Sequence, residues 1–442
     1  MQFIRSANLL KNTTNWLFCL FPLSIILGNL AINLNIILFI VFSIIFIIKN
    51  QIRLEFNNSI FLFFIFCCIL IFSSLANEQS LIKSLSYLRF VIFFYLGFLL
   101  SEKIFNIKKI FLTFSIITSI LCLDLILQHI ASVNILGLKN ATTGATSFFF
   151  DERVAGSFVQ NFGFFLVFII FELLKKKNIF NLFLRSFLIS LISIALLVTF
   201  QRMPMIIWCF FLIFYGIIYF KSKLLSILIS FLFLTLFVFN NDWAKEKTTN
   251  SYGAFIANVK TIISQSYNTY KINMDKERLM KLKSNQKDVD QFIKDNGNDD
   301  QSIYNYGGHA NLYGNALAVW KNNQILGIGY KNFYKKCLEL KFTRCSSHPH
   351  NYYLDVLTST GLLGFIILLF FLINIFIKII LSLKITNHEN LNINFILIIN
   401  FFMIFFPLRS SGSFVTTANS AYMILILILL TFQLNKNKRI KF

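Results

Sequence analysis

The sequence contains few of the residue patterns that hold a catalytic metal. Its seven cysteines and five histidines include no CxxC pair and no HExxH motif, and its carboxylates form no clustered set. His348 and His350 are close in sequence, but two imidazoles are too few ligands for a zinc site. We therefore expect no metal and no other cofactor.

Charge is also scarce. Only 14% of the 442 residues are charged, whereas 56% are hydrophobic and 17% are aromatic. Apolar runs of about 20 residues, long enough to cross a bilayer as helices, recur along the chain. This pattern excludes a soluble fold and predicts an all-α polytopic membrane protein with about twelve transmembrane helices and one large periplasmic loop. We interpret the many phenylalanines as lipid-facing residues and not as platforms for sugars.

The apolar runs divide the chain into three regions. Residues 1–240 would carry transmembrane helices 1–9 with a short periplasmic segment near 132–157, residues 241–357 the large periplasmic loop, and residues 358–442 helices 10–12 and a basic cytoplasmic tail. Because the second run follows the first directly, we expect the first to be an uncleaved helix and not a signal peptide. The expected spans are 14–32, 34–48, 59–76, 82–100, 109–131, 158–174, 182–200, 203–220, 223–240, 358–380, 392–408 and 416–433.

Basic residues are distributed unequally between the connections. One set of short connections contains lysines such as Lys49, Lys108 and Lys384, whereas the other set, for example around Asn77, contains few. This distribution follows the positive-inside rule and predicts cytoplasmic N- and C-termini. Most of the net charge of +22 lies outside the 241–357 loop. Since that charge reflects topology, we expect a lipid bilayer and no nucleic acid as partner.

The cysteines fall into two groups. Five lie in expected spans and are interpreted as small core residues. Cys337 and Cys345 lie in the large loop, where an oxidising compartment permits a disulfide. The sequence leaves open whether that bond forms.

The segment Ser346–Gly364, SSHPHNYYLDVLTSTGLLG, marks the change from the polar loop to an apolar span. Pro349 suits a first helical position, so we expect a helix to begin there, capped by one of the two preceding residues. His350 and Asn351 would then lie in the first turn. That turn favours a bound anion and a neutral imidazole, which can act as a general base. The alternative is a histidine that only caps a helix at the membrane interface.

Three arginines flank the spans on the same expected outer side. Arg153 precedes the sixth span, Arg202 lies in the turn after the seventh, and Arg409 follows the eleventh. One guanidinium group can donate two parallel hydrogen bonds to the oxygens of a phosphate. These three arginines therefore predict a lipid diphosphate as ligand. The alternative is that each arginine only reaches lipid headgroups. Asp124 and His129, near the outer end of the fifth span, are weaker candidates for the same cavity.

Several of these segments resemble the O-antigen ligase and polymerase superfamily of bacterial envelope glycosyltransferases. The resemblance depends mainly on HPHNYYLDVLTSTGLLGF at 348–365 and is supported by LGIGYKNF at 326–333, RVAGSF at 153–158 and the outer-turn Arg202. It extends over about residues 150–442. Two segments depart from the family pattern: VQN follows RVAGSF where the family often has Asn-Pro-Asn, and Gln-Arg-Met at 201–203 replaces the frequent Ser-Arg-Gly.

The resemblance implies an inverting, metal-independent transfer of a glycan from undecaprenyl diphosphate to an acceptor hydroxyl. The reaction would take place at the periplasmic side of the bacterial inner membrane. On the matching positions, His350 would be the general base and Asn351 would hold the helix start. Arg153 and Arg202 would bind the diphosphate and stabilise charge on the leaving group.

Two further residues are added to this expected site. Topology places Arg409 with the other substrate-binding arginines, and His348 is close enough in sequence to orient His350. The sequence does not separate a ligase that uses lipid A core as acceptor from a polymerase that extends a growing glycan, or from an enzyme that glycosylates protein hydroxyls. The single large loop before the His-Asn motif favours a ligase.

A polysaccharide or lipid transporter is the main alternative outside this superfamily. Transporters typically combine matching halves with broken helices at the bilayer midplane. In this sequence the polar residues gather at the outer ends of the spans, and the two halves show no repeat. A transporter would require a polar pathway that reaches both sides of the membrane.

Overall fold

The computed structural model of the chain is built from helices. It describes residues 2–55, 57–78, 81–139, 144–150, 152, 154–218, 223–246, 248–249, 266–274, 308–342, 345–383, 388–407, 409 and 412–439. These residues form no β-strand, although Val133 and Lys139 make an isolated antiparallel bridge. The helices are α1 (Gln2–Cys19), α2 (Phe21–Leu27), α3 (Asn29–Lys49), α4 (Asn58–Ala76), α5 (Leu81–Leu85), α6 (Leu88–Ile104), α7 (Ile107–Ala131), η1 (Ser147–Phe149), α8 (Ala155–Leu173), α9 (Ile179–Val198), α10 (Arg202–Ile218), α11 (Leu224–Phe239), α15 (Gly308–Asn322), α16 (Phe333–Glu339), α17 (Tyr352–Leu383), α18 (His388–Ile404) and α19 (Thr417–Arg439).

Eight helices of the described chain are long and apolar enough to cross a membrane. Three expected spans correspond instead to shorter apolar helices, namely Arg202–Ile218, Leu224–Phe239 and Asn392–Ile404. The all-α membrane fold is therefore confirmed, whereas the expected number of about twelve spans is not. The eight are Asn29–Lys49, Asn58–Ala76, Leu81–Ile104, Ile107–Ala131, Ala155–Leu173, Ile179–Val198, Tyr352–Ser382 and Thr417–Leu434.

The first expected span, 14–32, is wrong as a single helix. α1 ends at Cys19, and Pro22 in the first turn of α2 has no amide that could continue the hydrogen bonds of α1. Gly28 then separates α2 from α3 with a φ of 95°, a conformation that glycine adopts without a steric penalty. Hydropathy alone does not reveal these two breaks.

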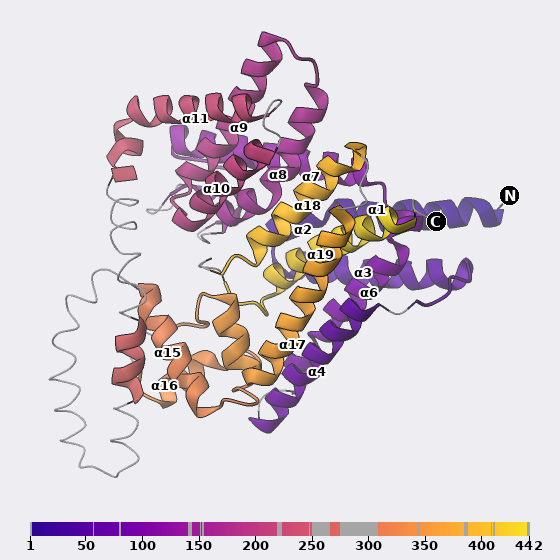
Figure 1. Cartoon of the computed structure of the whole chain (residues 1–442), viewed down its shortest axis with the longest axis vertical. Helices are drawn as coiled ribbons and strands as arrows, with labels where there is room; N and C mark the ends of the chain where they lie inside the picture. The colour runs from indigo at the N-terminus through magenta and orange to yellow at the C-terminus, as the bar shows by residue number, and fades with distance from the viewer. Residues whose placement is uncertain are drawn as a thin grey trace.

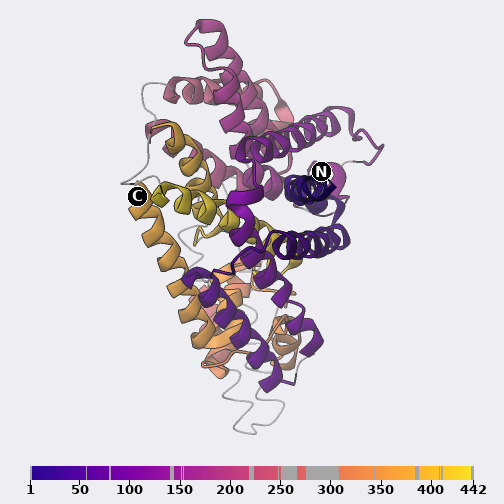
Figure 2. The same cartoon turned by 90° about the vertical axis from the view of Figure 1, so that its right-hand side faces the viewer.

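Helices α15 and α16 lie at one end of the molecule, beside the start of α17 (Figure 1). We call this region the α15 end. The start of α1 and the end of α19 lie on the opposite side, and both chain ends come into view when the molecule is turned (Figure 2). The start of α1 and the end of α19 therefore lie on the same side of the molecule in this view (Figure 1). Their assignment to the cytoplasm stays a prediction.

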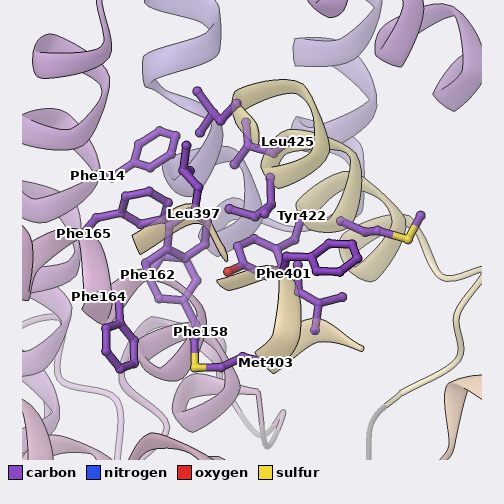
Figure 3. Close-up of a cluster of buried hydrophobic side chains, with 14 of the residues drawn as sticks. Phe114, Phe158, Phe162, Phe164, Phe165, Leu397, Phe401, Met403, Tyr422 and Leu425 are labelled. Carbon is purple, nitrogen blue, oxygen red and sulfur yellow. The ribbon is translucent and has the colours of Figure 1, made fainter. Parts of the chain in front are cut away.

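The phenylalanines are not only lipid-facing residues. Buried side chains from α7, α8, α18 and α19 fill the centre of the bundle (Figure 3). The ring of Phe162 lies 5.5 Å from Phe114 and 5.1 Å from Tyr422, both edge to face, which is a favourable aromatic geometry. The lipid-facing interpretation is wrong for these buried rings, although it fits Phe72, which is 57% exposed.

α17 is bent at Gly361, where φ is 63° and ψ is −162°. A loop that precedes α16 docks on this bend through its backbone. The amides of Ile328 and Gly329 donate to carbonyl oxygens in the turn before Gly361, at 2.8 and 3.0 Å. On the other side of the bend, the amide of Leu362 donates to the carbonyl oxygen of Gln324 at 2.8 Å. The loop thus satisfies backbone groups that the bend exposes.

Two glycines permit this close backbone contact. A Cβ on Gly361 would lie 2.2 Å from the carbonyl oxygen of Ile325. A Cβ on Gly327, whose φ is 69°, would lie 2.5 Å from the carbonyl oxygen of Thr358. Gly327 of LGIGYKNF and Gly361 of the STG segment are therefore explained by one docked interface between them.

The end of α4 completes this interface, which we call the α17 joint. The side-chain amide of Asn77 donates to the carbonyl oxygen of Gly327 at 3.0 Å. Ser73 donates to a carbonyl oxygen of α17 at 2.8 Å, and the amide of Tyr330 donates to Ser74 at 2.9 Å. An early helix thereby fixes the two segments that carry the family motifs.

Candidate functional site

The start of α17 positions the histidines of the HPHN segment. Asn351 precedes the helix and caps it, because its Oδ1 accepts hydrogen bonds from the amides of Tyr353 and Leu354 at 3.0 and 3.2 Å. Its side-chain amide donates to the carbonyl oxygen of Pro407 at 2.8 Å. The expectation that the helix begins at Pro349 is wrong, since α17 begins three residues later.

His350 therefore lies outside the first turn of α17. Its φ is 58°, a left-handed conformation that directs the chain from Pro349 into the cap. Its Nε2 lies 3.3 Å from the hydroxyl of Ser346. The position of the His350 imidazole is therefore set by the backbone immediately before α17.

Three imidazoles gather at this point. The ring of His348 lies 4.2 Å from that of His350, and its Nδ1 is 2.8 Å from the hydroxyl of Ser347. The Nε2 of His348 is buried and has no hydrogen-bond partner among the described residues. The third ring is that of His309 on α15, which meets His350 edge to face at 5.0 Å.

Sequence reasoning missed His309. It lies 41 positions before His350, outside every motif, and no residue pattern connects the two. Only folding brings α15 against the start of α17. Within the described chain, no group of three or more His, Cys, Asp or Glu side chains could hold a metal ion.

Burial keeps this cluster of imidazoles neutral. It lowers the pKa of His350 below the ordinary value of 6.5, and it lowers the pKa of His309 and of His348 to about 4. The neighbouring His350 contributes to the lowered pKa of both His309 and His348, after burial. Near pH 7 each ring has an unprotonated nitrogen, so the cluster can accept a proton.

Arg202 acts electrostatically on this cluster. It is exposed at the first position of α10, and its positive charge contributes to the lowered pKa of His309. Arg202 is therefore near enough to His309 to act on it electrostatically. Arg202 contributes a fixed positive charge beside the neutral imidazoles.

The turn before Arg202 is fastened to the start of α8. The side-chain oxygen of Gln201 accepts hydrogen bonds from the amide and hydroxyl of Ser157, at 2.9 and 3.2 Å. A Cβ on Gly156 would lie 2.9 Å from the same oxygen. The RVAGSF segment and the outer turn are therefore in contact. Arg153 itself lies outside the described residues.

Arg409 is buried and hydrogen-bonded to the protein. Its guanidinium donates to the carbonyl oxygen of Met403 at 3.2 Å and to the side-chain oxygen of Asn161 at 3.4 Å. It also lies 6.0 Å from the centre of the Tyr352 ring. These contacts tie the end of α18 to α8 and α17. A role for Arg409 in substrate binding stays a prediction.

Asp124 and His129 shape the neighbouring loops. Asp124 is fully buried and accepts hydrogen bonds from the amide of Ile135 at 2.9 Å and from the hydroxyl of Ser147. His129 packs on Trp243 with ring centres 4.1 Å apart, and Trp243 packs on Phe200 in the turn before α10. Both residues support the segments that surround the candidate site.

Cys337 and Cys345 form a disulfide, which settles the question that the sequence left open. The bond joins α16 to the segment that leads to His348. A small hydrophobic core that includes Leu312, Val319 and Phe333 packs beneath it. The disulfide and this core support the chain on which the histidines lie.

A bundle of apolar helices with neutral imidazoles and an arginine at one end defines a polytopic membrane protein with a polar site at the ends of its helices. Residues 187–369 match the family model described as O-Antigen ligase. This segment includes Arg202, His309 and His350, and the match confirms the resemblance to the O-antigen ligase and polymerase superfamily. No curated protein matches the chain.

The family match and the apolar helices together indicate the cellular context. They point to a multi-pass protein of the bacterial inner membrane with a glycosyltransferase function of the O-antigen ligase or polymerase type. Proteins of this kind act on lipid-linked glycans in a membrane environment.

Proposed function

We propose that the protein is an O-antigen ligase that transfers a glycan from undecaprenyl diphosphate to a hydroxyl of lipid A core. The reaction would occur at the α15 end, on the periplasmic side of the inner membrane. The observation that carries the proposal is the group of neutral imidazoles around His350, next to the charge of Arg202.

In this reaction His350 acts as the general base. It accepts the proton of the acceptor hydroxyl while the oxygen attacks the anomeric carbon of the first donor sugar. The bond between that carbon and the diphosphate oxygen breaks, and undecaprenyl diphosphate leaves with the electron pair. Attack opposite the leaving group inverts the anomeric configuration. The neutral state of His350 supports this role because a protonated ring could not accept the proton.

Arg202 and Arg153 bind the donor diphosphate and stabilise the negative charge that develops on it. The position of Arg202 supports this role, since it is an exposed residue at the first position of α10. Arg153 precedes Gly156 by three residues, and Gly156 packs against the residue before Arg202. No step of this mechanism requires a metal ion.

The test is a transfer assay with the purified full chain in proteoliposomes. The donor is an undecaprenyl-diphosphate-linked glycan, and lipid A core, a second lipid-linked glycan and a serine-containing peptide are offered as separate acceptors. The wild type is expected to transfer to lipid A core. His350→Gln, which retains a polar side chain near Ser346 but is not a base, is expected to lower kcat by about 10²- to 10⁴-fold.

Lys335→Gln is the matched control, because Lys335 is an exposed residue of α16 that makes an ion pair with Glu339 at 3.9 Å. Its rate should equal that of the wild type. Transfer only to the second lipid-linked glycan would identify a polymerase, and transfer only to the peptide would identify a protein glycosyltransferase. Full activity of His350→Gln would refute the assigned base, and movement of the donor across the bilayer without transfer would identify a transporter.

A further inference from the structure

A second group of cations lies at the α15 end and takes no part in the mechanism above. It consists of Lys83 on α5, Arg89 at the start of α6, and Lys331 in the loop before α16. Burial lowers the pKa of Lys331, and the positive charges of Arg89 and Lys83 lower it further. Lys331 is therefore close enough to Arg89 and to Lys83 for their charges to repel it.

The described side chains offset the positive charge of this group only in part. Among the described residues, none of Lys83, Arg89 and Lys331 takes part in an ion pair. Asp355 attracts Lys331 and so offsets part of this repulsion, but among the described residues it makes no ion pair with Lys331. Its carboxylate instead accepts hydrogen bonds from the hydroxyl of Ser413 at 2.6 Å and from the amide of Phe414 at 2.8 Å. Like charges held together cost electrostatic free energy, which a bound anion would offset.

Arg89 is held in place and retains an unused donor. Its guanidinium donates to the carbonyl oxygen of Ser86 and to the hydroxyl of Thr417, the latter at 3.4 Å. Its Nε is buried and has no hydrogen-bond partner in the described part of the chain. Such orphaned buried donors are uncommon in folded proteins, and this one lies within the cation group.

The position of Lys331 is fixed by the α17 joint. The preceding residue, Tyr330, donates its amide to Ser74 at 2.9 Å and its hydroxyl to the carbonyl oxygen of Val415 at 3.3 Å. The ammonium of Lys331 lies 5.2 Å from the centre of the Tyr330 ring. The same joint that supports α17 thus holds this cation beside the start of α19.

The surroundings indicate an anion that is carried by a lipid. Next to Lys83, α5 exposes the apolar side chains of Ile82 (81%) and Leu85 (42%). These side chains suit contact with acyl chains, whereas a site for a free anion would not require them. The cation group therefore borders a surface where a lipid headgroup and its acyl chains can bind together.

We infer that Lys83, Arg89 and Lys331 bind a phosphate group of the acceptor, a phosphorylated glycolipid in the same leaflet as the donor. The inference rests on the proposed function, in which the transfer of a glycan between two lipids requires both lipids at the α15 end. Arg202 binds the diphosphate of the donor, and this separate cation group binds the phosphate of the acceptor. Two sets of cations allow two polyanionic headgroups to bind at the same time.

Binding is tested with bisphosphoryl lipid A and the purified full chain in dodecyl maltoside, by native mass spectrometry. Arg89→Gln and Lys331→Gln are each expected to weaken binding about tenfold or more, whereas Arg89→Lys retains most of it. The control Lys335→Gln should bind as the wild type does. Enzymatic removal of the lipid A phosphates should abolish the difference between the wild type and the variants.

Two results would overturn the inference. One is equal binding of lipid A by the wild type and by both glutamine variants, provided that thermal unfolding shows them folded. The other is equal competition by phosphatidylglycerol or by inorganic phosphate, which would identify a general headgroup site or a site for a free anion.

The transfer assay separates this inference from the proposed function. Lys331→Gln should raise KM for the acceptor about tenfold and leave KM for the donor unchanged, whereas Arg202→Gln should affect mainly the donor. Normal transfer with an unchanged acceptor KM would refute the inference and leave the function intact. Lipid A binding that requires these residues, without any transfer by the wild type, would support the lipid site and refute the function.

Discussion

At the scale of single residues, the state of His350 depends on its surroundings. Burial disfavours a positive charge on His350 and on the two neighbouring imidazoles, and Arg202 adds to this effect at His309. A base at this position is therefore ready to accept a proton at neutral pH without a carboxylate partner. An ordinary exposed histidine would lose this capacity as the pH falls through about 6.5.

The first prediction concerns the pH dependence of transfer. Because the pKa of His350 is lowered, the unprotonated form persists below pH 6.5, and kcat/KM should remain level down to that pH before it falls. The pH profile of kcat/KM for the wild type, measured for the transfer to lipid A core with the donor at a saturating concentration, checks this. A fall in kcat/KM towards acidic pH with its midpoint above pH 6.5 would contradict a lowered pKa of His350.

The sequence revealed part of this site. His350 and Arg202 could be proposed from their chemistry and from their positions at the ends of expected spans. His309 could not, because it contacts His350 only through the packing of α15 against α17. The helix start was misplaced because the capping capacity of Asn351, which satisfies two amides, outweighed the preference of Pro349 for a first helical position.

At the scale of elements, the α17 joint determines how the site is supported. The bend at Gly361 exposes backbone groups, and the loop at 326–333 and the end of α4 satisfy them. The resemblance to the superfamily singled out the loop at 326–333 and the segment around Gly361, but not the end of α4. The sequence could not predict that the loop, α17 and the end of α4 contact one another. Backbone hydrogen bonds between distant segments do not change the periodicity of the side chains.

The second prediction tests the joint. Gly361→Ala should destabilise the protein by more than about 3 kcal/mol, because the new Cβ meets the carbonyl oxygen of Ile325 in addition to the strain of a positive φ. Gly137→Ala is the control, since Gly137 also has a positive φ (78°) but nothing within 4 Å of a Cβ. It should cost only about 1–2 kcal/mol. Thermal unfolding in detergent measures both, and equal losses would argue against the close contact.

The third prediction concerns the disulfide. Cys337→Ser removes a link that closes a short loop beneath the histidines, so it should destabilise the α15 end by about 2–3 kcal/mol and reduce transfer. The amount of protein in the membrane should not change. Cys68→Ser, at an exposed free cysteine, serves as control and should retain full activity. Unchanged activity of Cys337→Ser would show that the bond does not support the site.

At the scale of the whole molecule, aromatic packing holds the bundle together. Hydropathy correctly indicated which segments are apolar, but it could not distinguish rings that face lipid from rings that face other helices. That distinction depends on how helices pair, as Phe114, Phe162 and Tyr422 show from three different helices (Figure 3). Hydropathy also did not reveal that three of the expected spans correspond to helices of fewer than 18 residues, so the expected number of spans stays a prediction.

The fourth prediction addresses this packing. Phe162→Ala should lower the free energy of unfolding by about 3 kcal/mol, because it opens a cavity among buried rings. Phe72→Ala, at a ring that is 57% exposed, should change it by less than about 0.5 kcal/mol. Unfolding in detergent, monitored by intrinsic fluorescence, compares the two. Similar effects would indicate that the central cluster contributes little to stability.

The α17 joint also has a consequence for biosynthesis. Its hydrogen bonds connect Ser73 with Ser359 and Asn77 with Gly327, across 286 and 250 positions of the chain. At ribosomal rates of about 5–20 residues per second, α4 leaves the ribosome roughly 15–60 s before its partner in α17. Ser73 and Asn77 of the α4 region therefore reach the membrane before their hydrogen-bond partners have been synthesised. A nascent chain that is stopped before residue 359 has inserted helices but has not assembled the α17 joint.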